Sequence, residues 1–373
     1  MVTIREAETK GDLVRFMEYP LHLYRDNPNY VPDILSSQVA DMIPGKNPAF
    51  EFCKAKCFLA FRGNEIVGRI AAILNERSNE KFGVKYLNFT HLDFIDDPEV
   101  SDALFGAVEA WAKELDCTAV HGPLGFSDMD REGLLVEGFD RESLFYTYYN
   151  APYYIEHLNR LGYDKQVDWI EMRVEIPPEP VPQIHRISEF IRSKQALRVI
   201  SLGDIPTRTI ANDVFDLWNN TYTKLFGVVP MTDAQKKKYV SEFLPMLNRK
   251  TTSFVYNDRE ELLAFAIACP SLDSAMKKNH GRTVPFGWIP LLKSLYGRNE
   301  QLDLLLIGVR PDMQGSGIAA VLIDDIHRKV IKAGFRYAET GPMLELNDKV
   351  QGLFSRFPTE THKRRRCFIK QLS

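Results

Sequence analysis

The stretch Leu304–Gly334, LLLIGVRPDMQGSGIAAVLIDDIHRKVIKAG, changes from a strand-like to a helix-like pattern across a short loop with two glycines. The apolar run Leu304–Val309 ends at Pro311, Gly315 and Gly317 follow, and apolar residues then recur at helical spacing up to the last glycine, which predicts a C-terminal cap. The first backbone N–H groups of a helix lack partners within it and lie at the positive end of its dipole. Glycines there let an anion approach closely, so the stretch predicts a phosphate-binding turn.

A Walker-type loop is excluded as the explanation of this turn. That motif requires Lys and then Ser or Thr after its last glycine. Here Ile318 and Ala319 follow Gly317, so neither side chain can supply the required amine or hydroxyl.

A dinucleotide-binding fingerprint is formally present but fits poorly. Gly315, Gly317 and Ala320 form G-x-G-x-x-A, and Glu339 stands about where an acid for the ribose is expected. In that fold the first glycine follows its strand almost directly, whereas residues 310–314 intervene here. The other expected strands also lack alternating βαβ order, so this interpretation is disfavoured.

The pattern Val309-x-Pro311-x-x-Gln314-x-x-Gly317-x-Ala319 resembles the acyl-CoA-binding signature of the GNAT acyltransferases. The preceding strand, the following helix, the next strand YAET and a last helix opened by Asn follow the GNAT order as well. The resemblance covers nearly all of the second half, residues 197–372.

This resemblance implies a site for acetyl-CoA or another acyl-CoA, with no metal. The pyrophosphate would lie on backbone N–H groups of residues 314–319, and the pantetheine arm would run along residues 307–309. The implied cofactor-binding residues are Ile307, Val309, Gln314, Gly315, Ser316, Gly317, Ile318, Ala319 and Asn347.

The resemblance also suggests catalytic residues. Acyl transfer to an amine needs a base and an acid for the leaving thiolate. Asp303 stands six residues before the motif valine, where one GNAT branch has its base, although a solvated strand edge is the alternative for this residue. Glu339 and Glu345 are further candidates. The family's usual acid is a tyrosine in the last helix, but Phe354 holds that position and Pro358 replaces the glycine that usually follows.

The chain repeats its element order on both sides of the proline-rich segment Ile176–Pro182. Both halves contain two strands around a polar turn, a further strand, an amphipathic helix (about residues 100–115 and 317–333) and a short strand that ends in Gly-Pro. We therefore expect an α/β fold with a mixed sheet, built as two tandem GNAT-like domains: a degenerate domain at 1–176, a linker and connecting helix at 177–195, and an acyl-CoA-binding domain at 196–373.

Only the second half carries the signature. The corresponding segment of the first half, FIDDPEVSDALFG, has no glycine pair and contains Asp96, Asp97 and Glu99, which would repel a pyrophosphate. The second half also has a long insertion with the apolar core PFGWIPLLKSLYG (residues 285–297). We expect this insertion to pack on its own domain, although it could instead line a pocket or cover a partner surface.

Composition and charge limit the classes of partner and the cellular location that the sequence allows. A net charge of −3 gives no reason to expect nucleic acid, and the basic run Lys363–Arg366 is expected to be a solvated edge of a last strand. Five scattered cysteines predict free thiols and a cytoplasmic protein, and no run is long enough to span a membrane.

The resemblance to the GNAT signature implies an acyl-CoA-dependent N-acyltransferase, most simply an acetyltransferase, that acts on a small-molecule or peptide amine. Two alternatives stay open: an aminoacyl or long-chain acyl transferase, and a non-catalytic module that binds acyl-CoA. The oligomeric state is not indicated by the sequence.

Overall fold

The computed structural model describes residues 1–222 and 224–372, and their contacts divide the chain into two compact units. Unit 1 comprises Met1–Ile170, Asp273–Leu291 and the chain from His362 onward; unit 2 comprises Glu171–Leu272 and Leu292–Thr361. Two segments of the second half thus pack with the first. The domain boundaries expected near residues 176 and 196 stay a prediction, since units defined by contacts need not coincide with duplicated domains.

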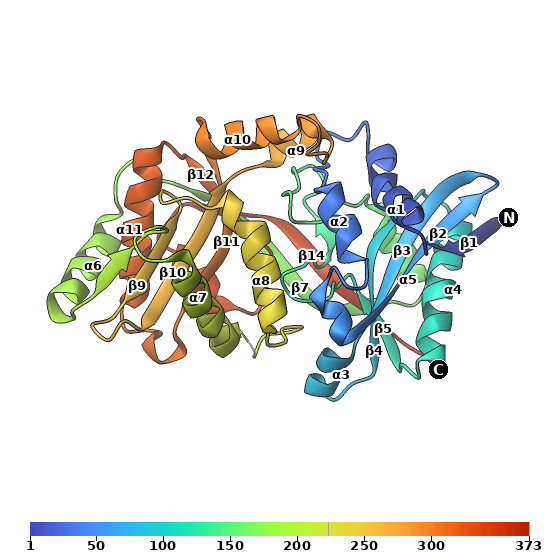
Figure 1. Ribbon diagram of the computed structural model, residues 1–373, viewed down its shortest axis with the longest axis horizontal. Coiled ribbons are helices and arrows are strands. Elements are labelled where there is room, and N and C mark those ends of the chain that lie inside the picture. The colour runs from blue at the N-terminus through green and yellow to red at the C-terminus, as the bar shows by residue number, and fades with distance from the viewer. Residues whose placement is uncertain (223, 373) are drawn as a thin grey trace. The chain divides into compact units, whose positions relative to one another are not determined.

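The elements up to the linker are β1 Val2–Glu6, α1 Lys10–Leu23, α2 Leu35–Asp41, β2 Cys53–Arg62, β3 Glu65–Asn75, α3 Glu76–Phe82, β4 Tyr86–Phe94, α4 Pro98–Glu114, β5 Ala119–Gly122, β6 Leu134–Glu137, α5 Tyr153–Arg160 and β7 Asp164–Glu175. Those after it are α6 Pro182–Lys194, β8 Arg198–Ile200, α7 Thr207–Tyr222, α8 Asp233–Phe243, β9 Thr252–Tyr256, β10 Leu262–Pro270, α9 Asp273–Asn279, α10 Trp288–Tyr296, β11 Gln301–Val309, α11 Ile318–Ala333, β12 Tyr337–Thr340, β13 Met343–Leu344, α12 Asp348–Gln351 and β14 Thr359–Gln371 (Figure 1).

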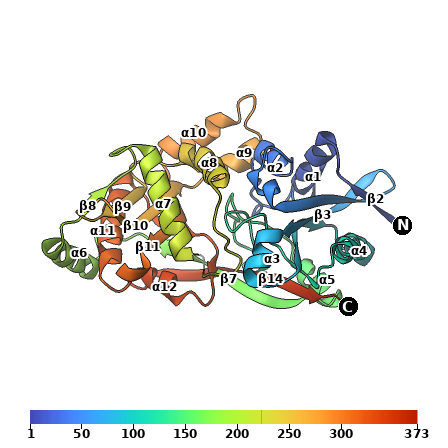
Figure 2. The same ribbon diagram turned by 60° about the horizontal axis from the view of Figure 1, so that its bottom comes forward.

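The sheet of unit 1 has the order β1-β2-β3-β4-β5-β14, with β14 next to β7, and helices cover both of its faces. Strand β2 shows how the sequence produces this layering, because alternate residues of a strand point to opposite faces. Phe58 and Ala60 pack in a core with α4 and α5, while Leu59 and Phe61 pack in a second core with α1 and α2. Helix α4 can be followed along the sheet in Figures 1 and 2.

The basic run Lys363–Arg366 lies in β14, and the prediction that it forms a solvated edge is wrong. β14 pairs with β5 and lies beside β7 inside the sheet, and both Lys363 and Arg365 are buried. The charged groups have polar partners. The Lys363 ammonium donates to the Glu142 carbonyl, and Arg366 forms a two-point ion pair with Asp168 at 2.8 and 3.0 Å. Burial acts to raise the pKa of Asp168, but hydrogen bonds from Arg366 and Lys165 outweigh it and lower that pKa.

The sheet of unit 2 runs β7-β12-β11-β10-β9-β8, with β11 and β12 parallel and their other neighbours antiparallel. Helices α11 and α6 pack together, and α11 also contacts β9 and β10, while α7 contacts β10 and β11. The predicted helix at 317–333 is confirmed as α11, and Gly334 ends it in the left-handed conformation at φ 89°. The last predicted helix is shorter than expected, since α12 is followed by a 3-10 turn at Gly352–Phe354.

The two units share an irregularity that supports a duplicated architecture. In each, a parallel pair of strands separates after a few residues: β4 pairs with β5 only over Tyr86–Asn88, and β11 pairs with β12 only over Gln301–Leu304. In each, the longer strand also carries a register shift against its antiparallel neighbour, typical of a β-bulge. The mixed α/β fold class is confirmed. None of the helices within residues 1–222 and 224–372 is long and apolar enough to cross a membrane.

Because β14 completes the sheet of unit 1, we expect the end of the chain to stabilise the first half. Phe368 is 1% exposed in the unit 1 core, and removing such a ring by Phe368→Ala is expected to cost about 3–5 kcal/mol. Hydrogen exchange should then show faster opening of β4 and β5. Phe254→Ala in β9 is the matched control, because Phe254 is equally buried in unit 2. This variant should speed hydrogen exchange in unit 2 instead. Equal loss of protection in both units for Phe368→Ala would contradict this assignment.

Candidate functional site

The candidate site begins where β11 and β12 separate. Beyond Leu304, β11 continues to Val309 with β10 as its only strand neighbour in the described parts of the chain. Its register against β10 shifts between Ile267 and Ala268, which leaves Leu305 as the extra residue of the bulge. One edge of this part of β11 is therefore available for hydrogen bonds to something other than a strand. We refer to this edge as the β11 opening.

Backbone geometry indicates which groups face the β11 opening. The N–H of Arg310 donates to the Leu263 carbonyl of the strand before it at 2.8 Å, so Arg310 points towards β10. Because backbone groups alternate in direction along a strand, those of Val309 and Ile307 point the other way. The Ile307 carbonyl accepts a hydrogen bond from the Tyr222 hydroxyl, which shows that this edge is accessible to a donor.

Tyr222 was not identified from the sequence. It ends helix α7, and its ring stacks on Trp218 with ring centroids 4.0 Å apart and planes 10° apart. An aromatic pair at i and i+4 on a predicted helix was the available signal, but such pairs more often stabilise helices than mark sites. Only the structure brings α7 to β11.

The loop between β11 and α11 has the backbone conformation that the glycines predict. Gly315 and Gly317 adopt φ of 81° and 91°, in the left-handed region that favours glycine. A Cβ on Gly317 would lie 2.8 Å from Cγ1 of Ile191 in α6, whereas one on Gly315 would meet nothing within 4 Å. The Ser316 hydroxyl donates to the Met313 carbonyl at 2.6 Å and holds the turn.

Four backbone N–H groups of this loop and of the start of α11 lack an acceptor in the part of the chain that the structure describes. Among the residues that the structure describes, none accepts a hydrogen bond from the N–H groups of Gly315, Gly317, Ile318 or Ala319. They lie at the N-terminus of the 16-residue helix α11, whose dipole is positive there. Such a set of donors fits a phosphate or pyrophosphate anion. The Lys349 ammonium also reaches the loop, donating to the side-chain carbonyl of Gln314 at 2.9 Å.

Two of the predicted catalytic carboxylates lie side by side. Asp303 on β11 is in register with Glu339 on β12, which is in register with Arg173 on β7, so the three side chains share one face of the sheet. Asp303 is 0% exposed, and its carboxylate accepts from the Gln301 amide at 3.0 Å. The alternative that Asp303 is a solvated strand edge is thereby excluded. Glu339 is 6% exposed.

The remaining predicted residues lie outside this row. Glu345 follows β13, is half-buried, and its backbone carbonyl accepts from the Gln351 amide at 2.9 Å. Asn347 is the N-cap of α12, where its side chain accepts weakly from the N–H of Val350 at 3.4 Å. A role for either residue near a ligand stays a prediction.

An apolar cavity of about 80 Å³ lies within unit 2, several times the space that one water molecule needs. It is lined by Val174, Ile176, Ala266, Ile267, Ala268, Leu302, Leu304, Leu306, Ile307, Ile323, Ile326, His327, Val330, Ala338, Phe354 and Phe357. Phe354, which stands where the GNAT resemblance predicts a tyrosine, is thus part of an apolar wall. Ile307 borders both the cavity and the β11 opening.

The corresponding opening in unit 1 is closed by its own chain. Beyond the β4–β5 pairing, the Phe89 carbonyl accepts from the N–H of Leu124 at 2.9 Å, and the N–H of Phe94 donates to the Tyr154 hydroxyl at 2.9 Å. Tyr154 is fully buried and Tyr153 donates to the Phe94 carbonyl. Tyr153 and Tyr154 at the start of α5 therefore pack against β4.

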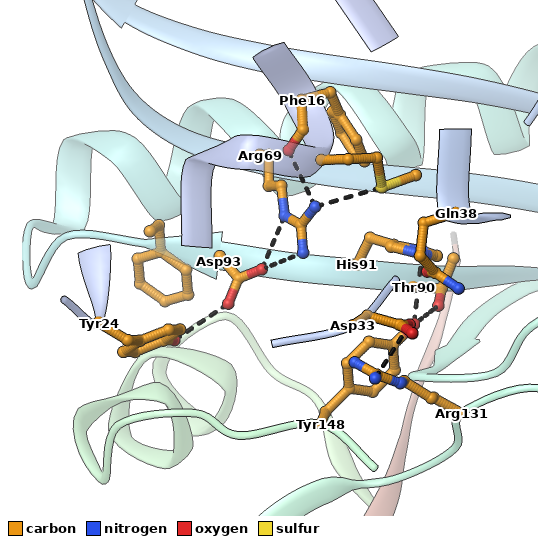
Figure 3. Close-up of polar contacts among 12 residues, drawn as sticks. Phe16, Tyr24, Asp33, Gln38, Arg69, Thr90, His91, Asp93, Arg131 and Tyr148 are labelled. Carbon is orange, nitrogen blue, oxygen red and sulfur yellow. Dashed lines mark hydrogen bonds and ion pairs between the residues drawn. The ribbon is translucent and has the colours of Figure 1, made fainter. Parts of the chain in front are cut away.

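A buried polar network continues this closure (Figure 3). Arg69 on β3 binds Asp93 on β4 at 2.7 Å through two nitrogens and also donates to the Phe16 carbonyl of α1 at 2.9 Å. His91 contacts Gln38 of α2 at 2.9 Å, and burial, with Arg69 and Arg131 nearby, holds its pKa well below the usual value. These contacts tie α1 and α2 to the sheet, so the network is explained as a structural feature of unit 1.

Comparisons with known proteins agree with this architecture. No family model matches the chain. Protein YghO of Escherichia coli (strain K12) is 28% identical over 378 residues, covering 99% of this chain and 95% of that protein. Bacterial ceramide synthase of Caulobacter vibrioides (strain NA1000 / CB15N) is 25% identical over 321 residues, covering 84% of this chain and 82% of the relative.

Solved structures give the fold. A tandem GNAT protein from the clavulanic acid biosynthesis pathway superposes with a TM-score of 0.57 at 12% identity, covering 100% of this chain and 98% of that chain. A GCN5-related glucosamine N-acetyltransferase region of a fungal multi-domain β-N-acetylglucosaminidase gives 0.56 at 12% identity, covering 99% of this chain and 38% of that one. The chain therefore has the fold of a tandem GNAT protein, with the acyl-CoA signature only in its C-terminal half.

Proposed function

We propose that the protein is an acyl-CoA-dependent N-acyltransferase that acts on an amine, with its donor site in unit 2. The observation that carries the proposal is the β11 opening beside four backbone N–H donors at the start of α11. In this proposal residues 314–319 hold the pyrophosphate, Ile307 and Val309 pair with the pantetheine arm, and Asn347 lies near it. When bound, acyl-CoA supplies the activated acyl group as a thioester.

The residues of the chain then have distinct roles. Asp303 accepts the proton that the amine loses as it forms the new C–N bond, directly or through water, and Glu339 and Glu345 are the other candidates for this step. Tyr222 replaces the missing tyrosine of the last helix and protonates the leaving thiolate. Its hydroxyl already reaches the β11 opening, where it donates to Ile307. The acceptor is a small-molecule or peptide amine.

A long-chain acyl donor is a second, more specific candidate. Two observations favour it: the apolar cavity that shares Ile307 with the β11 opening, and the relative named bacterial ceramide synthase. A chain of methylene groups gains about 0.8 kcal/mol for each group buried in such a cavity. An acetyl group would leave most of the cavity empty.

Acyl-CoA binding tests the donor site. A carboxylate in the loop before α11 repels pyrophosphate, so Gly315→Glu, whose Cβ would meet nothing within 4 Å, is expected to weaken acyl-CoA binding by at least a hundredfold in calorimetry. Gly334→Glu is the matched control, because it places the same side chain at a left-handed glycine (φ 89°) at the opposite end of the same helix. This control should bind nearly as tightly as the wild type. Absence of binding by the wild-type protein to acyl-CoA of any chain length would refute the donor site.

Turnover tests the two proton-transfer roles. Asp303→Asn and Tyr222→Phe are each expected to lower kcat about 10²–10⁴-fold with little change in acyl-CoA affinity, because general acids and bases contribute about that much. Thiol release with a panel of amines measures the rate, and Tyr337→Phe on β12 controls for loss of a hydroxyl. Asp303→Asn removes the base, so it should remove the acidic limb of the pH–rate profile. Tyr222→Phe removes the acid, so it should remove the alkaline limb. Tight binding with no turnover on any amine would instead indicate a non-catalytic acyl-CoA-binding module.

Donor chain length tests the cavity. Ile326→Trp places a bulky side chain in the cavity wall and should reduce affinity for long-chain acyl-CoA at least tenfold while sparing acetyl-CoA. Ile331→Trp, five residues later on α11 and outside the cavity lining, is the control. If the wild type prefers acetyl-CoA and Ile326→Trp changes nothing, the long-chain candidate is wrong while the donor site stands.

A further inference from the structure

The insertion between β10 and β11 presents an apolar surface that the fold leaves uncovered. Its first part packs with unit 1: the N–H of Phe145 donates to the buried Asp273 at 2.8 Å, and Arg282 pairs with Glu18 at 2.6 Å. The expectation that the insertion packs on its own half is therefore wrong for this part. Helix α10 follows, shown in orange in Figure 1, and has no buried residue.

The exposed side chains of α10 form one stripe. Trp288, Leu292 and Tyr296 are spaced by four residues and Ile289 lies next to them, so all four fall within an arc of about 100° around the helix. Val284 and Phe286 precede the helix and are also exposed. The exposed fractions of these six side chains range from 37% for Ile289 to 79% for Val284. We call these six residues the α10 patch.

Isolated apolar side chains on a surface need no explanation, but a contiguous group of large ones marks an interaction site. The composition of the α10 patch is that of a membrane interface, where Trp and Tyr place an apolar ring in the acyl region and a polar atom near the headgroups. The helix spans about 13 Å, enough to lie on a bilayer surface and too short to cross it.

The charges around the α10 patch identify the kind of surface it fits. Between Asp273, which is buried, and Glu300 the sequence contains no acidic residue. Lys278, Lys293 and Arg298 are exposed in this interval. Arg298 lies 3.7 Å from the Glu300 carboxylate, whereas Lys293 lies on α10 directly beside the apolar stripe. Basic side chains flanking an apolar helix face favour a negatively charged lipid surface.

We propose that the α10 patch docks on an anionic lipid bilayer, with α10 lying in the plane of the interface and Lys278, Lys293 and Arg298 among the headgroups. The aromatic and aliphatic stripe enters the acyl boundary while the basic residues contact lipid phosphate. This docking does not depend on the proposed acyl transfer, and a protein with no transferase activity would still show it.

Vesicle binding by the full chain tests the proposal. The protein should sediment with vesicles of phosphatidylglycerol and phosphatidylcholine, much less with pure phosphatidylcholine, and less at high salt. Brominated acyl chains should quench Trp288, since the other three tryptophans are at most 8% exposed. Leu292→Ser with Tyr296→Ser should reduce partitioning at least tenfold, and Lys278→Glu with Lys293→Glu should abolish the preference for anionic vesicles.

A matched variant separates the α10 patch from exposed aromatic residues in general. Phe190 on α6 is 61% exposed and lies outside the patch, so Phe190→Ser should bind vesicles as the wild type does. Failure of the wild type to bind anionic vesicles at low salt would overturn the proposal. The proposal would also be overturned if the wild type bound no vesicles but self-associated, and if Leu292→Ser with Tyr296→Ser abolished that self-association. The α10 patch would then be a contact between two copies of the chain.

Discussion

The separation of β11 from β12 after Leu304 is the constraint on which the organisation of unit 2 depends. A strand inside a sheet has both edges occupied, so it has no free backbone groups to offer a ligand. The bulge at Leu305 and the early end of pairing release one edge of β11 while β10 holds the other. The same strand continues through residues 310–314 into the glycine loop, which places the N-terminal donors of α11 just beyond the end of the released edge.

In unit 1, β4 and β5 separate in the same way, but the edge that this frees is occupied by other parts of the chain. There the freed backbone of β4 is satisfied within the chain, by the N–H of Leu124 and the hydroxyls of Tyr153 and Tyr154. Unpaired backbone groups are costly in a protein interior, so a buried strand edge that pairs with no strand needs such internal partners. The Arg69–Asp93 pair and its neighbours extend this closure as a buried polar network beside the apolar cores of unit 1.

Local features were predictable from the sequence, whereas features set by distant parts of the chain were not. The loop glycines, helix α11 and its cap at Gly334 follow from spacing alone. The basic run in β14 was misjudged because four charged residues normally mark an exposed strand. Its partners, such as Asp168, lie about 200 residues away and become visible only when the strand is placed inside the sheet. The burial of Asp303 and the position of Tyr222 depend in the same way on tertiary contacts.

A phenylalanine at position 354, where the resemblance to GNAT enzymes predicts a tyrosine, is consistent with the cavity that Phe354 helps to line. A hydroxyl there would need a hydrogen-bond partner, and the lining of aliphatic and aromatic side chains offers few, so phenylalanine avoids the cost of a buried unsatisfied group. If the site transfers acyl groups, its proton donor must then come from a different element. Tyr222 meets that requirement from α7, because its hydroxyl reaches the edge of β11 that the loss of pairing exposes. Under the proposed function, the apolar wall that includes Phe354 would hold the acyl chain and the phenol of Tyr222 would donate the proton, so the two tasks would fall to different parts of the unit.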